Sequence, residues 1–153
     1  MVVEPPYRQK TKTMIKKYII GIMFLLPLLA ACEKDKLEDS TPPEAVVSLP
    51  TDNTVYTRGN TLMFTGEFTD DVELKECTFY LSQGLKASRG WDDPWEPSPQ
   101  TFPLSGKEDS LVEQYLFELA IPADIKSGDY ILSILTVDKA LNYSTTEIPI
   151  MIK

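Results

Sequence analysis

Gly128-Asp129-Tyr130-Ile131-Leu132-Ser133-Ile134 is the stretch that decides the fold of this 153-residue chain. It predicts a β-strand with an inward position at Leu132, two residues after a tyrosine. From Ala45 onward, similar short alternating runs are separated by turn residues roughly every ten positions, and no amphipathic helix is visible. The sequence therefore predicts an all-β sandwich of about seven strands over residues 45–153.

Two motifs in this region carry a resemblance to known domains. In immunoglobulin-type sandwiches, a tyrosine near the start of one strand closes a corner through its hydroxyl, two residues before an inward position. Tyr130 and Leu132 match that spacing, and the segment 138–142 resembles the Asp-x-x-Gly-Asn turn of bacterial Ig-like and cadherin-like modules, with Leu141 where those modules usually have glycine. Residues 45–153 are similar to uncharacterised Ig-like domains of surface lipoproteins from Gram-negative gut anaerobes. The resemblance implies an Ig-like β-sandwich and no known activity.

Alternation within the other predicted strands indicates which side chains face the core. The strands are expected at 45–49, 61–68, 74–82 and 111–121, with a last strand near the C-terminus. The side chains expected to share a face within a strand are Leu62, Phe64, Gly66 and Phe68; Cys77, Phe79 and Leu81; Tyr115, Phe117, Leu119 and Ile121; and Ile148, Ile150 and Ile152.

The N-terminal region has the parts of a bacterial lipoprotein signal. Lys16 and Lys17 precede an apolar run from Tyr18 to Leu29, and the small residues before Cys32 form a lipobox. The alternative, a transmembrane anchor, is disfavoured because Pro27 interrupts a run shorter than the roughly 20 apolar residues that a span needs. We expect residues 1–31 to be a signal peptide, with Met14 as the true start, and Cys32 to carry the lipid.

Processing changes the charge of the chain, which is −8 overall. The segment 1–31 holds five of the 15 basic residues and one of the 23 acidic ones, so the mature chain keeps ten basic and 22 acidic residues, a net charge of −12. A surface this acidic repels phosphate backbones, so nucleic acid is not an expected partner.

Residues 32–44 are expected to be a lipidated, flexible tether, because they are charged and contain Pro42-Pro43. The charged run from Glu33 to Lys36 resembles the signals that send some lipoproteins to the outer face of the outer membrane. We therefore expect a lipid-anchored outer-membrane protein with its domain at the cell surface. The alternative is a merely solvated linker and a domain on the periplasmic side.

Catalysis is not expected, because the chain contains no histidine and so has no imidazole for a serine or cysteine nucleophile. Once Cys32 carries lipid, Cys77 has no disulfide partner, and on the inward face of a strand it behaves as a small hydrophobe. Asp92, Asp93 and Glu96 are the clustered carboxylates near aromatic rings, but a domain of this size offers no deep groove around them.

The stretch 83–103 contains both tryptophans, Trp91 and Trp95, and is expected to be a long, proline-stiffened loop. Aromatic faces beside carboxylates suit sugar rings, so Trp91, Trp95, Asp92 and Asp93 are candidate ligand-binding residues. The alternative is that the indoles fold back and cap the open edge of the sandwich.

A second group of polar residues follows two predicted strands whose loops lie at the same pole of an Ig-type sandwich. Their oxygen atoms could converge on a Ca²⁺ ion, which takes six to eight oxygen ligands. The alternative is that each side chain caps its own turn, with no metal cofactor. The residues are Asp70, Asp71, Glu73, Asp138 and Asn142.

These features favour a non-catalytic binding module for glycan or protein, anchored to a membrane and accessory to nutrient uptake. The alternative is a structural or envelope-interaction lipoprotein with no small-molecule ligand.

The first prediction concerns the anchor. Cys32→Ser should release the protein from the membrane fraction, because stable anchoring needs two or more buried acyl chains. Metabolic labelling with a fatty-acid analogue should mark the unaltered protein and not the variant. Cys77→Ser is the matched control and should stay labelled, and labelling of Cys32→Ser would contradict the lipobox.

Overall fold

Two β-sheets make up the part of the chain that the computed structural model describes, residues 39–84, 93–117 and 120–153. These residues belong to one compact unit, Asp39–Lys153. They contain no helix long and apolar enough to cross a membrane. The strands are β1 (Glu44–Leu49), β2 (Thr54–Tyr56), β3 (Leu62–Thr69), β4 (Leu74–Gln83), β5 (Gln100–Pro103), β6 (Glu108–Leu116), β7 (Gly128–Asp138) and β8 (Tyr143–Ile152).

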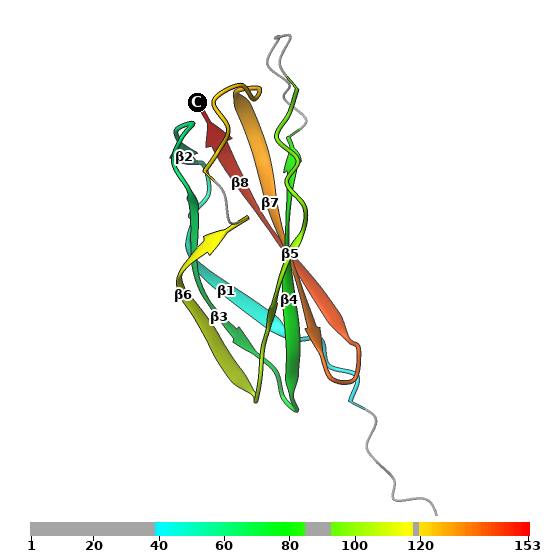
Figure 1. The fold of residues 1–153 in the computed structure, drawn as a ribbon. Helices are drawn as coiled ribbons and strands as arrows, with labels where there is room; N and C mark the ends of the chain where they lie inside the picture. Colours follow the sequence, from blue (N-terminus) through cyan, green and yellow to red (C-terminus); the bar gives the residue numbers. More distant parts are fainter. Residues whose placement is uncertain (1–38, 85–92, 118–119) are drawn as a thin grey trace, which may run out of the picture. The chain divides into compact units, whose positions relative to one another are not determined.

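The two sheets differ in size and in the direction of one strand. The three-stranded sheet has the order β1-β3-β6 and is antiparallel, and the five-stranded sheet has the order β2-β8-β7-β4-β5. In the larger sheet the short edge strand β2 runs parallel to β8, and the other pairs are antiparallel. Figure 1 shows the two sheets as separate layers. The expected all-β class is therefore confirmed.

The core between the sheets follows the predicted alternation in most strands. In β3, Leu62, Phe64 and Phe68 are completely buried, and in β4, Cys77 and Phe79 are as well. The Phe64 and Phe79 rings bring the two sheets together edge to face, with centroids 4.8 Å apart, an arrangement that aromatic pairs favour. The three C-terminal isoleucines predicted to share a face, at positions 148, 150 and 152, are also buried.

The predicted face of β6 is wrong in part. Tyr115 was expected to point inward, but it is 57% exposed and its neighbour Leu116 is buried. The register between β3 and β6 shifts after Phe64, and Glu113 has a positive φ of 51°, as in a β-bulge. Because side chains alternate with a period of two, an extra residue changes the face on which the neighbouring side chains lie. Phe117 and Ile121 are buried as expected, and Leu119 lies outside the described residues.

The long loop expected over residues 83–103 is shorter in the structure. Its last part forms the edge strand β5, in which Phe102 pairs with Cys77 of β4. Residues ahead of β1 also belong to the compact unit. This unit includes Asp39, and hydrogen bonds hold Asp39 and Thr41 ahead of β1.

Tyr130 takes the buried corner position that the sequence predicts. Its side chain is 1% exposed, and its hydroxyl donates a hydrogen bond of 2.6 Å to the carbonyl of Lys126, four residues upstream. The same hydroxyl accepts a bond of 3.1 Å from the backbone N–H of Trp95. One phenol oxygen therefore connects the start of β7 to two loop segments.

We expect Tyr130→Phe to lower the free energy of unfolding by about 1–3 kcal/mol, because the half-buried carbonyl of Lys126 and the buried N–H of Trp95 both lose their partner. Urea unfolding of the purified protein measures this loss. Tyr143→Phe is the matched control, since Tyr143 is 64% exposed, and its curve should match that of the unaltered protein. An unchanged midpoint for Tyr130→Phe would contradict a structural role for the hydroxyl.

Candidate functional site

Three carboxylates from distant parts of the sequence meet at one end of the domain. Asp70 begins the β3–β4 loop, Asp138 ends β7 before the turn to β8, and Asp39 precedes β1. One carboxylate oxygen of each lies within 4.8 Å of those of the other two. Figure 1 shows the β3–β4 loop and the β7–β8 turn at the same end of the molecule, opposite the C-terminus. We call this set the aspartate cluster.

Asp138 is the most deeply placed member of the cluster, with no exposed surface. Its two carboxylate oxygens accept hydrogen bonds of 2.8 Å from the backbone N–H and the side-chain amide of Asn142. The turn between them places Leu141 at φ = 73°, the left-handed region in which glycine is favoured. The turn motif therefore forms, although a leucine occupies the usual glycine position.

Asp70 uses only one of its carboxylate oxygens within the protein. Oδ2 accepts hydrogen bonds from the backbone N–H groups of Val72 (2.9 Å) and Glu73 (2.6 Å), which shapes the β3–β4 loop. Oδ1 is buried and has no hydrogen-bond partner in the described structure. A buried acceptor without a partner destabilises the folded state, so we expect this oxygen to contact a ligand or a solvent molecule.

Asp39 is the member of the cluster that sequence reasoning missed. Its carbonyl accepts a bond of 3.0 Å from the side-chain amide of Asn142, and its Oδ1 accepts one of 3.1 Å from the N–H of Thr41. The Thr41 hydroxyl in turn donates to Oδ2 of Asp71 at 3.2 Å. The sequence held no signal for this contact, because residues 32–44 were expected to be a free tether.

Two of the predicted metal ligands lie outside the cluster. Asp71 and Glu73 are exposed side chains of the β3–β4 loop. The carbonyl of Asp71 accepts a bond from the ammonium group of Lys107, and the carbonyl of Glu73 accepts one from the N–H of Lys139. In the part of the chain that the structure describes, no basic side chain forms an ion pair with a member of the aspartate cluster.

The predicted tryptophan platform is described only in part, because Trp91 and Asp92 lie outside the described residues. Trp95 is 8% exposed, and its indole packs edge to face on Phe117 with centroids 5.8 Å apart. Asp93 is exposed, and its carbonyl accepts a bond from Lys126. The geometry of Trp95 supports the alternative in which the indole is a structural cap.

Cys77 lies on the inward face of β4 and is completely buried. Burial raises the pKa of its thiol to about 12. The thiol is therefore protonated at neutral pH and is a packing group rather than a nucleophile.

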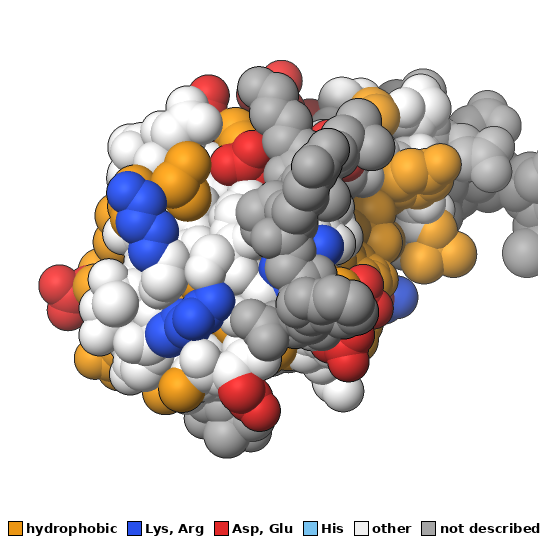
Figure 2. All heavy atoms as spheres, turned by 90° about the horizontal axis from the view of Figure 1, so that it is seen from above, with side chains coloured by type: hydrophobic (Ala, Val, Ile, Leu, Met, Phe, Trp, Pro, Cys, Tyr) orange, Lys and Arg blue, Asp and Glu red, His pale blue; other side chains and the backbone are white. Residues whose placement is uncertain are grey.

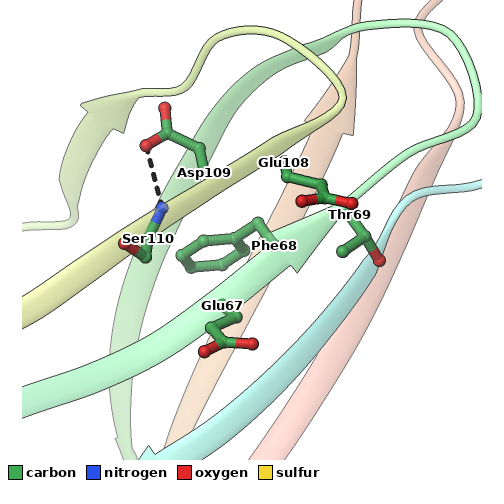
Figure 3. A pocket seen from close by; sticks show the side chains of 6 residues that line it. All are labelled: Glu67, Phe68, Thr69, Glu108, Asp109 and Ser110. Atoms are coloured by element: carbon green, nitrogen blue, oxygen red, sulfur yellow. Dashed lines mark hydrogen bonds between the residues drawn. The ribbon is translucent and has the colours of Figure 1, made fainter.

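An open hollow of about 410 Å³ lies on β3 and β6, lined by Glu67, Phe68, Glu108 and Asp109 among others. Figure 3 shows that the three carboxylates around it do not converge on one point. Asp109 uses its oxygens on the backbone N–H groups of Ser105 and Ser110. The hollow is acidic, but its geometry does not resemble that of the aspartate cluster.

The outer face of the three-stranded sheet carries several exposed apolar side chains. Val46 of β1, and Val112 and Tyr115 of β6, are 62%, 69% and 57% exposed, and Tyr115 pairs with Met63 of β3. We call these four residues the β1-β3-β6 face. At the end of the molecule seen in Figure 2, by contrast, basic, acidic and apolar side chains are interspersed.

Trp95→Ala should lower the free energy of unfolding by about 3–5 kcal/mol, the usual cost of removing a large buried aromatic side chain. Urea unfolding monitored by circular dichroism measures the change. Tyr115→Ala is the matched control and should stay within about 0.5 kcal/mol, because Tyr115 is exposed. Equal stability of Trp95→Ala and the unaltered protein would contradict the structural-cap role.

Comparison with known proteins gives a family and no activity. No curated protein matches this chain. A β-glucosidase from Listeria innocua, whose structure was solved in complex with glucose, is 12% identical and aligns with a TM-score of 0.37. That alignment covers 72% of this chain but only 16% of the enzyme chain. Residues 30–153 match the family described as "Domain of unknown function (DUF4625)". Because this match covers most of the sequence, the chain belongs to the DUF4625 family.

Proposed function

We propose that this protein is a membrane-anchored, non-catalytic binding module. In this proposal a lipid on Cys32 holds it in the outer membrane, with an Ig-like β-sandwich at the cell surface. It binds a glycan or protein partner there as an accessory to nutrient uptake. The buried hydroxyl of Tyr130, which bonds back to Lys126, supports the Ig-like assignment, because a tyrosine corner is a hallmark of that fold.

The observation that carries the binding role is the β1-β3-β6 face. Exposed apolar side chains on a soluble domain can mark an interaction site. Met63 and Tyr115 are direct cross-strand partners, so this face presents an aromatic ring beside aliphatic side chains on a sheet surface. Tyrosine is enriched at binding surfaces because one part of its ring is apolar and the hydroxyl is polar.

A catalytic role is not part of the proposal. The chain has no histidine, and burial keeps the Cys77 thiol protonated, so the usual nucleophile–base pairs cannot form from these residues.

One observation favours the second candidate, a structural or envelope-interaction lipoprotein without a small ligand. Trp95 was a candidate for stacking on sugar rings, but its indole packs on Phe117 inside the domain. A buried ring offers no face to a sugar. On this account, the sandwich docks or spaces other envelope components.

The β1-β3-β6 face can be tested with the full-length protein purified in detergent. If the partner is a glycan, Tyr115→Ser should abolish retention of the protein on a glycan array. If the partner is a protein, a photoreactive residue at position 112 should cross-link to it in living cells, and Tyr115→Ser should abolish this cross-link. Tyr143→Ser is the matched control, because Tyr143 is also exposed, at 64% against 57% for Tyr115, but lies on β8 of the other sheet.

Two outcomes separate the candidates. Loss of retention or cross-linking in Tyr115→Ser, with Tyr143→Ser unaffected, supports the binding module. No glycan retention and no cross-link at position 112 in the unaltered protein contradicts it and favours the structural lipoprotein.

A further inference from the structure

The aspartate cluster places three negative charges together without a basic partner among the described residues. Asp138 is completely buried, and the oxygens of Asp39 and Asp70 lie within 4.8 Å of one of its own. Like charges at this separation repel, and water weakens the repulsion least at Asp138, the one completely buried member, whereas Asp39 and Asp70 are half-buried. A cation bound between these oxygens would offset the repulsion.

A second feature concerns one member of the cluster, Asp70. The Oδ1 atom of Asp70 is buried and has no donor, although Oδ2 of the same carboxylate accepts two backbone hydrogen bonds. Turn capping accounts for the hydrogen bonds of Oδ2, but it gives no partner to the buried Oδ1. A buried oxygen lone pair without a hydrogen-bond donor is satisfied if it coordinates a cation.

Asp39 also caps a local turn, because its Oδ1 accepts the hydrogen bond from the N–H of Thr41. This local bond does not account for the place of Asp39 beside Asp70 and Asp138, which lie 31 and 99 residues further along the chain. Asn142 holds it there, because its side-chain amide donates to the carbonyl of Asp39 and to Oδ2 of Asp138. Asn142 thus acts as a positioning residue for two members of the cluster.

The spacing and the donor type both suit calcium. Ligand oxygens bound to Ca²⁺ at about 2.3–2.6 Å lie at most about 5 Å from one another, and the three aspartate oxygens are within 4.8 Å. All three donors are hard carboxylate oxygens, which disfavours soft transition metals. Ca²⁺ also tolerates irregular sites in which solvent completes the shell, whereas Mg²⁺ demands near-octahedral geometry.

We infer that Asp39, Asp70 and Asp138 bind one Ca²⁺ ion, which joins the segment before β1 to the β3–β4 loop and the β7–β8 turn. This site is separate from the β1-β3-β6 face. It therefore stands whether or not the proposed partner binding is correct.

The experiment uses the full-length protein in detergent, stripped with EDTA and titrated with CaCl₂ or MgCl₂. Isothermal titration should show one Ca²⁺ per chain with a Kd of about 10⁻⁴–10⁻³ M, the range of extracellular calcium modules. The melting temperature should rise by several degrees in CaCl₂ at concentrations well above Kd, because the ion binds only the folded state. MgCl₂ should give a smaller shift.

Asp70→Asn and Asp39→Asn should weaken Ca²⁺ binding at least about tenfold, since each removes one charged ligand. Asp70→Asn keeps an oxygen for the bonds from Val72 and Glu73, so it should melt in EDTA at or above the temperature of the unaltered protein. Asp71→Asn is the matched control, because Asp71 is an exposed neighbour outside the cluster, and it should keep full affinity.

The inference is overturned by the absence of a calcium-dependent melting shift and of stoichiometric binding in the unaltered protein. It is also overturned if Asp71→Asn loses as much affinity as Asp39→Asn, which would indicate diffuse attraction to an acidic surface. Equal effects of Mg²⁺ and Ca²⁺ would overturn the assignment to calcium.

Discussion

Every second side chain of β7 points into the core, and this alternation constrains both ends of the domain. Tyr130, Leu132 and Ile134 form the apolar part of the inward row, and Thr136 and Asp138 continue it. A slip of one residue would expose the apolar side chains, so the register is fixed by their burial. The same register forces the Asp138 carboxylate inward at the end of the strand.

Buried polar groups at the two ends of β7 differ in whether they have hydrogen-bond partners. At the start of β7, the Tyr130 hydroxyl both donates and accepts a hydrogen bond, so it is fully used. At the other end, Asp70 Oδ1 and the hydroxyl of Thr136 are buried without partners. More polar atoms therefore lack hydrogen bonds at the Asp138 end of β7 than at the Tyr130 end. The proposed Ca²⁺ ion would supply a partner for Oδ1 of Asp70.

The features proposed to act in binding are distributed over separate parts of the domain. The aspartate cluster lies where residues 39–43 join the sandwich, and Asp39 follows the proposed lipid-bearing Cys32 by seven residues in the sequence. The β1-β3-β6 face lies on strands of the smaller sheet. A cation that fixes the segment before β1 would therefore leave this face free for a partner.

Sequence patterns by themselves determined the all-β class, the inward residues of β3, β4 and β8, and the corner at Tyr130. They succeeded because period-two alternation and a two-residue spacing are local properties. The face of Tyr115, the burial of Trp95 and the position of Asp39 were decided only by tertiary structure. A bulge shifts the register of β6, Trp95 meets a hydroxyl 35 residues away, and Asp39 meets Asn142 103 residues away. Such contacts depend on which strands become neighbours, and no local pattern in the sequence encodes that order.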